Sequence, residues 1–300
     1  MNPNIEARPA GDPSREPQFD VVADHGFDAF PTLANDPIVT SFVVQIGSET
    51  RRSTEIPLAE LLGRLEDGGP HPSTSQPAPE VYAASYRQAT RPVLAVTVSA
   101  ALSGSMNAAD QARPLAPEVA VTLHDSGTVS AAQSFQVHAA MTARARGHDI
   151  DTAVAWMRAV HAETEFYFTI GTLKYLLRGG RIGRVQAALG TMLDMKPIVT
   201  VDKKVGAYVT AARARSWKRA VDTIAQQVTT RFGEGTPLRV GLVHGLHTDD
   251  AEAVLARIRE HHPILWSDLT PTGPALAVHV GPVAVAVAVA PGPWPWEQAG

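Results

Sequence analysis

The 300-residue sequence contains no cysteine. The chain therefore forms no disulfide bond and offers neither a thiolate nucleophile nor a thiolate metal ligand. Its formal net charge at pH 7 is −4, with 26 basic against 30 acidic side chains. Binding to nucleic acid requires a basic face that neutralises phosphates, so this balance argues against nucleic acid as the main partner.

A long hydrophobic segment is also missing. The most apolar stretch, residues 275–290, is shorter than the ~20 residues that a membrane-spanning helix requires, and His279, Gly281 and Pro282 interrupt it. Valine and alanine alternate over residues 283–289, which predicts a buried β-strand rather than a membrane span.

The N-terminal stretch has no apolar core. Residues 1–18 are polar and rich in proline, unlike a secretory signal. We therefore expect a disordered leader and a cytoplasmic protein.

Several motifs of familiar enzyme chemistry are absent from the sequence. There is neither a Gly-x-Ser-x-Gly elbow nor a His-Glu-x-x-His motif. The glycine-rich run at residues 179–183 lacks the Gly-Lys-Ser/Thr ending of a nucleotide-binding loop. We expect no metal site and no nucleotide site in this chain.

The periodicity of the sequence predicts two α/β domains. In the first half, strands at 19–24, 38–46, 93–98 and 119–123 alternate with helices at 56–67, 108–113, 129–146 and 150–163, which is typical of a parallel sheet. In the second half, we expect strands at 197–201, 205–211, 238–244, 275–280 and 283–289, a helix at 215–232 and a mixed sheet. The predicted parts are a leader (1–18), an N-terminal domain (19–160), a C-terminal domain (161–290) and a loose tail (291–300).

Two clusters of hydroxyl side chains stand where loops lead into helices. Thr74 and Ser75 precede one helix, and Ser103, Gly104 and Ser105 precede the next. Hydroxyl groups beside exposed helix-start amides form a donor-rich pocket for an anion. The same residues also serve as ordinary helix caps, and one hydroxyl group can do both.

A helix, a stop and a second helix follow one another in the centre of the sequence. Leucines at 173, 176 and 177 form the apolar stripe of the first helix, and Gly179 and Gly180 end it. Arg181 then stands at the start of the second helix. A guanidinium in this position can hold an anion, or it can be a solvent-facing side chain at a helix junction.

Five motifs in this order resemble the DegV family of bacterial fatty-acid-binding proteins. They cover residues 19–289 and are Thr74-Ser75-Gln76-Pro77, Leu102-Ser103-Gly104-Ser105, Asp125-Ser126 with Ser130, Gly179-Gly180-Arg181-Ile182 and Val278-His279-Val280-Gly281-Pro282. The sequence departs from the family pattern at His25, at Ser105-Met106 and at Val283, where glycine is usual. The departure at Val283 puts the loop near His279 in question.

The resemblance implies a non-enzymatic carrier that grips a long-chain fatty acid between two domains and presents it to a separate fatty acid kinase, which makes acyl phosphate. It places the carboxylate on Thr74 and Ser103, with Arg181 and His279 nearby and Ser75, Gly104 and Gly180 in support. A basic segment resembles the family's segment after the hairpin, which suits a kinase-docking face: Arg213, Arg215, Lys218 and Arg219. The alternative for each of these side chains is an ordinary solvated helix face. No cofactor besides the lipid ligand is implied, and transient membrane contact is compatible with the reading.

Two alternatives remain open from the sequence. The hydroxyl loops could belong to an enzyme that acts on a small phosphorylated or carboxylated ligand. The departure at Val283 and the unusual leader would also suit a degenerate member that serves as an interaction protein.

Overall fold

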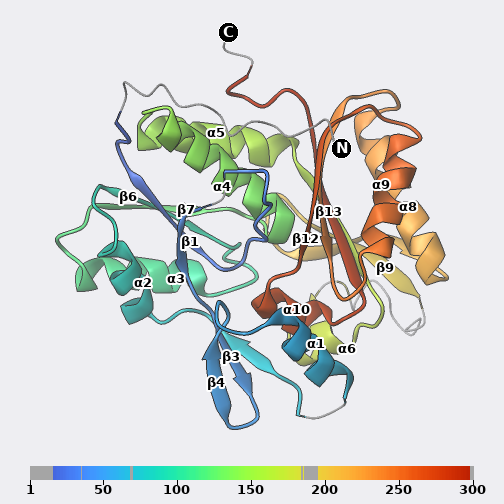
Figure 1. Ribbon diagram of the computed structural model, residues 1–300, viewed down its shortest axis with the longest axis horizontal. Helices are drawn as coiled ribbons and strands as arrows, with labels where there is room; N and C mark the ends of the chain where they lie inside the picture. Colours follow the sequence, from blue (N-terminus) through green and yellow to red (C-terminus); the bar gives the residue numbers. More distant parts are fainter. Residues whose placement is uncertain (1–15, 35, 68–69, 184, 186–194, 298–300) are drawn as a thin grey trace.

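The computed structural model describes residues 16–34, 36–67, 70–183, 185 and 195–297. Its framework consists of two separate β-sheets with helices packed between and around them (Figure 1). The fold is mixed α/β, with a parallel sheet in the first part of the chain and a mixed sheet in the second, as the sequence predicts. No described helix is both long enough and apolar enough to cross a membrane.

The first sheet has four parallel strands in the order β2-β1-β6-β7. Its strands are β1 (Asp20–Asp24), β2 (Ile38–Thr40), β6 (Val93–Thr97) and β7 (Val121–Asp125). Every residue of β1 and β6 is buried, as expected for strands covered on both faces. The helices α2 (Pro79–Tyr86) and α3 (Ser105–Ala112) cover one face.

The second sheet has six strands in the order β10-β9-β8-β13-β11-β12. These are β8 (Glu165–Ile170), β9 (Lys196–Val201), β10 (Tyr208–Ala214), β11 (Leu238–His244), β12 (Ile264–Pro271) and β13 (Ala284–Pro291). All neighbours are antiparallel except β11 and β12. The outer face is covered by α8 (Trp217–Phe232) and α9 (Asp249–Arg259), at the right of Figure 1.

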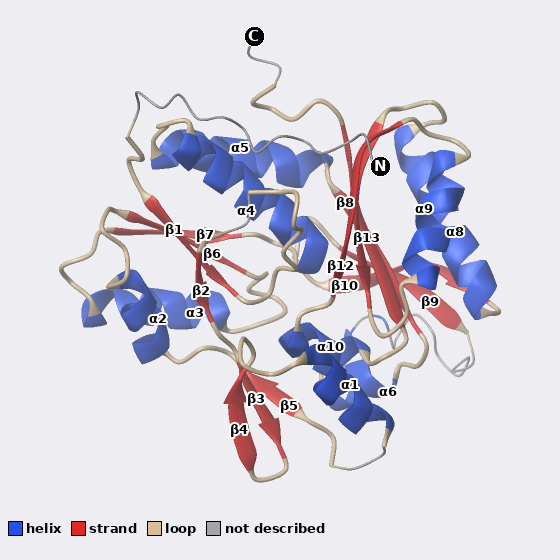
Figure 2. Ribbon diagram, in the orientation of Figure 1, coloured by secondary structure: helices blue, strands red, loops and turns tan. Residues whose placement is uncertain are grey.

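The helices α4 (Ser130–Ala145) and α5 (Ile150–Glu163) form the layer that joins the two sheets (Figure 2). Thirteen residues of α4 are buried, so this helix lies in the core rather than on the surface. One continuous core cluster includes residues of both sheets and of both helices. The halves of the chain therefore share a hydrophobic interior, although their sheets are separate.

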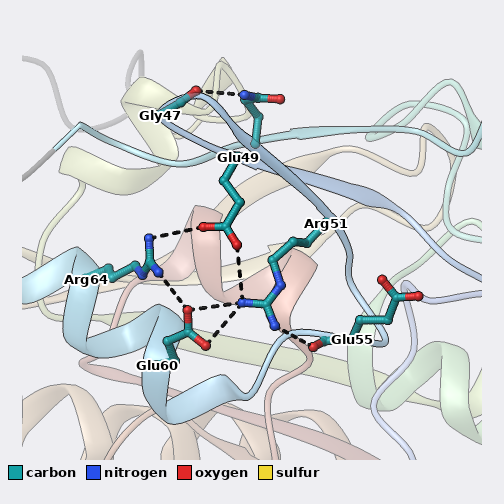
Figure 3. A network of polar contacts seen from close by, with 7 residues as sticks. Gly47, Glu49, Arg51, Glu55, Glu60 and Arg64 are labelled. Atoms are coloured by element: carbon teal, nitrogen blue, oxygen red, sulfur yellow. Dashed lines mark hydrogen bonds and ion pairs between the residues drawn. The ribbon is translucent and has the colours of Figure 1, made fainter.

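A small third sheet carries one wall of the site described below. It is antiparallel, in the order β4-β3-β5, and comprises β3 (Val43–Ile46), β4 (Glu49–Arg52) and β5 (Ser73–Ser75). An ion network ties it to helix α1 (Leu58–Glu66), as Figure 3 shows. In this network Arg51 lies 3.1 Å and Arg64 lies 2.9 Å from the carboxylate of Glu60, and both arginines lie near Glu49.

Three of the predicted elements are wrong in detail. Residues 275–280 form the helix α10 (Pro274–Val280), not a strand, because Pro274 begins it and Gly281 (φ 78°) ends it. The strand expected at 38–46 divides into β2 and β3, which belong to different sheets. Residues 73–75, expected as a loop, pair with β3, and the strands β4, β8 and β12 were not predicted.

The C-terminal segment is packed against the protein up to residue 297. Trp294 and Trp296 are 2% and 5% exposed, and their rings stack at 5.3 Å. The guanidinium of Arg239 lies 4.8 Å from the ring of Trp294, and the Arg239 side chain also pairs with Glu297. The prediction of a loose tail is therefore wrong for residues 291–297. Most of the predicted leader and the helix predicted after Arg181 lie outside the described residues.

Candidate functional site

Four side chains from distant parts of the chain line one cavity where the three sheets meet. This polar cavity contains about 550 Å³ of space between atoms, part of it open to solvent. Its polar lining consists of Thr74, Gln76, Ser103, Arg181 and His279. The structure thus brings together all four residues on which the sequence reading placed a carboxylate.

Thr74 and His279 lie in direct contact. Thr74 is on β5 and His279 is in the last turn of α10, and the Oγ1 and Nε2 atoms are 2.7 Å apart. The other ring nitrogen, Nδ1, is buried and has no partner among the described residues. A buried N–H without a partner is rarer in proteins than a buried acceptor without one, so we assign the proton to Nε2. Thr74 then accepts this bond, and its own hydroxyl hydrogen remains available to a ligand.

His279 is held as a neutral ring. Burial, followed by the positive charges of Arg181 and His71, lowers the pKa of His279 to about 4. The ring packs directly against the backbone of Gly179: a Cβ atom at that position would lie 2.2 Å from Nδ1. The glycine that the sequence reading assigned to ending a helix therefore also makes room for the histidine.

Ser103 is linked to a buried carboxylate. Its Oγ lies 3.0 Å from Oγ of Ser105, and Ser105 in turn hydrogen-bonds to Asp24. Burial raises the pKa of Asp24 to about 6, although bonds from Gln133, the Val98 amide and Ser105 oppose the shift. With Ser105 donating to Asp24, the Ser103 hydroxyl donates to Ser105 and can be redirected to a stronger acceptor in the cavity.

Arg181 supplies a positive charge to the cavity. Helix α6 (Lys174–Arg178) ends at Gly180, which adopts φ 70°, and the Arg181 amide donates to the carbonyl of Leu176. This turn aims the guanidinium at the cavity, where Nη1 donates to the carbonyl of Gly179 at 2.6 Å. The remaining N–H groups of the fork leave Arg181 able to bind an anion.

The three supporting residues occupy different places. Gly104 and Gly180 line an open hollow outside the polar cavity, which shares Leu102, Ser103, Arg181 and Tyr208 with it. We call this the mouth hollow. A Cβ atom at Gly104 would overlap the side chain of Gln76, so glycine there permits this contact. Ser75 is exposed on β5 and is not among the residues that line either space.

An apolar cavity adjoins the polar one. It contains about 380 Å³ of space between atoms and lies among the start of α4, the helix α10 and one face of the second sheet. Its walls include Phe166, Phe168, Leu276 and Ala286. The two cavities share four lining residues: Val129, Tyr208, Leu276 and Val280.

The alternating strand β13 explains why this space exists. Its valines at 285, 287 and 289 pack with the outer helices, whereas the alanines at 286, 288 and 290 belong to the inner core. Of these alanines, Ala286 lines the cavity. Small side chains on the inner face leave unfilled volume there. The sequence shows the alternation, but only the fold shows which face is hollow.

The loop after α10 is well packed despite its departure from the family pattern. Val283 fits against Gly171, where a Cβ atom would lie 2.8 Å from the valine Cβ, and its carbonyl accepts from the Gly171 amide at 2.7 Å. The carbonyl of Pro282 similarly fills the space beside Gly245. The valine is therefore accommodated by a glycine on the neighbouring segment.

The basic residues expected to dock a kinase are all exposed. Arg213 and Arg215 flank the end of β10, and Lys218 and Arg219 lie in the first turn of α8. Tyr208, at the opposite end of β10, borders the mouth hollow. At ~3.3–3.4 Å per strand residue, the basic cluster begins about 17 Å from that border.

No group of three or more histidine or acidic side chains within the described part of the chain is arranged to hold a metal ion. The sequence reading did not identify Gln76 or Tyr208 as lining residues, although Gln76 lies inside a quoted motif. Tyr208 carried no signal beyond its place in a predicted strand.

The fold and the two cavities define an α/β protein in which a polar cavity adjoins an apolar interior cavity. A family model described as "Uncharacterised protein, DegV family" matches residues 18–292. A DegV domain-containing protein of Deinococcus radiodurans is 53% identical over 270 residues, which cover 89% of this chain and 94% of that protein. The chain belongs to the DegV family.

Two solved structures show how general this fold is. A fatty-acid-binding DegV family protein from Thermus thermophilus superposes with a TM-score of 0.80 and 26% identity, covering 91% of this chain and 99% of that one. The Fatty Acid Kinase (Fak) B3 protein of Streptococcus pneumoniae, loaded with linoleic acid, has a TM-score of 0.79 at 17% identity, covering 92% and 100%. The second likeness bears on the fold alone.

Proposed function

We propose that this protein binds one long-chain fatty acid, with the carboxylate in the polar cavity and the hydrocarbon tail in the apolar cavity. The observation that carries the proposal is that the two cavities adjoin each other and share four lining residues. Polar donors line one of these cavities, and mainly aromatic and aliphatic side chains line the other. A free fatty acid likewise has a polar carboxylate at one end and an apolar hydrocarbon tail at the other.

The energetics agree with this ligand. A buried carboxylate must be hydrogen-bonded, because an unpaired buried charge is prohibitive. Thr74, Ser103 and Arg181 supply these donors, and His279 positions Thr74. Each methylene group that leaves water contributes about 0.8 kcal/mol, so a long tail provides a large driving force. Ser75, Gly104 and Gly180 would act in support through the loops that carry these donors.

The relatives support the proposal independently. The chain belongs to a family whose member from Thermus thermophilus is a fatty-acid-binding protein, and the two chains are 26% identical. The fold is shared almost over the full length of that protein.

We further propose that the protein is a carrier that presents the carboxylate to a separate fatty acid kinase at the mouth hollow. The Fak B3 protein of similar fold motivates this role. Arg213, Arg215, Lys218 and Arg219 would form the docking face. Because this face lies well away from the mouth hollow, the kinase would have to contact both.

Native mass spectrometry of the purified protein tests the lipid ligand. We expect one co-purified acyl chain, and we expect Ser103→Ala to retain less of it. Ser73→Ala is the control serine substitution. Ser73 is exposed on β5 of the small sheet and lines neither cavity. Equal lipid retention in Ser103→Ala and the control would contradict the assignment of the carboxylate site.

A reconstituted reaction tests the carrier role. With a fatty acid, ATP, magnesium and a fatty acid kinase, acyl phosphate should form only when this protein is present, and charge reversal of Arg215 and Lys218 should slow it. Turnover without any kinase would instead favour an enzyme. A protein that binds and is stabilised by no fatty acid would favour a pure interaction role.

A further inference from the structure

Tyr208 occupies the junction of the three spaces. Among the described residues, it alone lines the mouth hollow, the polar cavity and the apolar cavity. The side chain comes from the start of β10 and is 9% exposed. Its ring meets the edge of Phe168 at a centroid distance of 5.2 Å. A ligand that occupies both the polar and the apolar cavity would therefore lie beside this side chain.

The hydroxyl group of Tyr208 has no hydrogen-bond partner within the described residues. By contrast, the hydroxyl of Tyr86, which is fully buried, donates to the carbonyl of Ala109 at 2.9 Å. Phe166 and Phe168 line the same wall of the apolar cavity, so a phenylalanine could provide the packing there. The hydroxyl group of Tyr208 is therefore available as a hydrogen-bond donor to a ligand in the cavities that it lines.

The surroundings make this hydroxyl group a neutral donor. Burial raises the pKa of Tyr208 well above its ordinary value, with a smaller opposing effect from Arg181 and a reinforcing one from Asp28. The phenol keeps its proton at physiological pH and can donate it. The influence of Arg181 also shows that Tyr208 lies within electrostatic range of the residue to which the carboxylate is assigned.

We propose that the Tyr208 hydroxyl donates a hydrogen bond to the carboxylate of the bound fatty acid. This inference rests on the proposed function and adds a third hydroxyl donor to those of Thr74 and Ser103, which line the same cavity. It assigns the site to ligands with an ionised head group, since a charged acceptor gains more from a buried donor than a neutral one does.

The test compares two variants and two ligands of equal chain length. Tyr208→Phe removes only the hydroxyl group, and Tyr167→Phe is the control, because Tyr167 is similarly buried but packs with the outer helices. Affinities for palmitic acid and for 1-hexadecanol are measured on the delipidated protein. Tyr208→Phe should weaken palmitate binding about 10- to 100-fold, as removal of a bond to a charged group does. The alcohol should lose only a few-fold, and the control should lose neither.

A spectroscopic measurement separates contact from packing. Palmitate labelled with ¹³C at the carboxyl carbon should show a different carboxyl signal in Tyr208→Phe than in the wild type, and an unchanged one in Tyr167→Phe. Equal palmitate affinity, or equal losses for acid and alcohol, would overturn the inference while leaving the proposed function intact. Failure of the wild type to bind palmitate would overturn both.

Discussion

Replacing Gly179 by alanine should disturb the polar cavity through a steric overlap with one residue, His279. The new Cβ atom would lie 2.2 Å from Nδ1 and 2.8 Å from Cε1 of His279, closer than carbon atoms approach in proteins. The φ angle of Gly179 is −74°, so alanine meets no backbone penalty there. The whole effect should therefore come from displacement of the imidazole ring.

The ring has little freedom to move without losing its partner. A shift that relieves the overlap breaks the 2.7 Å contact with Thr74 and leaves buried polar atoms unpaired. Overpacking and a lost buried hydrogen bond each cost about 1–3 kcal/mol, and relaxation will make the total less than their sum. We expect the free energy of unfolding to fall by about 2 kcal/mol and the affinity for a fatty acid to fall at least tenfold.

Urea denaturation of the lipid-free protein measures the first effect, and binding of a fatty acid measures the second. Gly63→Ala is the control: Gly63 lies inside α1, a Cβ atom there meets nothing within 4 Å, and alanine should stabilise the helix by about 0.5–1 kcal/mol. If Gly179→Ala proves as stable as this control and binds lipid normally, His279 does not pack on Gly179 and the site geometry is wrong.

Three further predictions follow from burial. Trp294→Ala should lower the free energy of unfolding by about 3–5 kcal/mol, because the indole is 2% exposed and lies against Arg239; a loss below about 1 kcal/mol in urea denaturation would show that the tail is not docked. Burial lowers the pKa of His138 to about 3, so the unfolded chain takes up a proton below pH 6.5 that the folded chain refuses. The stability due to the neutral ring is complete above pH 6.5 and declines toward pH 3, by about 2 kcal/mol between pH 7 and pH 5. The free energy of unfolding of His138→Gln should lack this contribution to the pH dependence. If the variant loses as much free energy of unfolding between pH 7 and pH 5 as the wild type does, the prediction is wrong. Ala286→Leu should fill the apolar cavity and weaken palmitate binding about tenfold or more, since two displaced methylenes are worth ~1.6 kcal/mol; unchanged affinity in a titration would place the tail elsewhere.

The helix α10 shows where the sequence was informative and where it was misread. Residues 275–280 are alanine, leucine, valine and histidine, and such a short apolar run fits a buried strand as well as a helix. The deciding signals were present at its ends, because Pro274 suits the first turn of a helix and Gly281 suits its stop. Reading the ends before the middle would have placed His279 on a helix.

Other differences could not have been found locally. Residues 73–75 are three hydroxyl side chains with no strand pattern, and they become a strand because β3 offers an edge. The strand expected at 38–46 changes sheets between Thr40 and Val43, and that change depends on which neighbours are already in place. Pairing partners are a property of the whole fold, so a pattern confined to one segment does not encode them.

The motifs predicted the residues that meet in the polar cavity better than periodicity predicted their supports. Four short motifs carry the four residues that meet there: Thr74, Ser103, Arg181 and His279. Tyr208 has no such motif around it. Its importance comes from the position of β10 at the edge of the second sheet, beside the mouth hollow.

The polar cavity can form only when all three sheets are in place. Thr74 comes from the small sheet, Ser103 from a loop after the parallel sheet, and Tyr208 from the mixed sheet. A ligand that contacts all three binds the folded arrangement and not the unfolded chain, so it stabilises the protein by RT ln(1 + [L]/Kd). The stabilisation should be smaller in any variant that releases one wall, including one that breaks the Arg51–Glu60 pair far from the ligand. On the proposed function, we therefore expect the ion network of the small sheet to influence the affinity for a fatty acid through the position of Thr74, although none of its members lines the cavity.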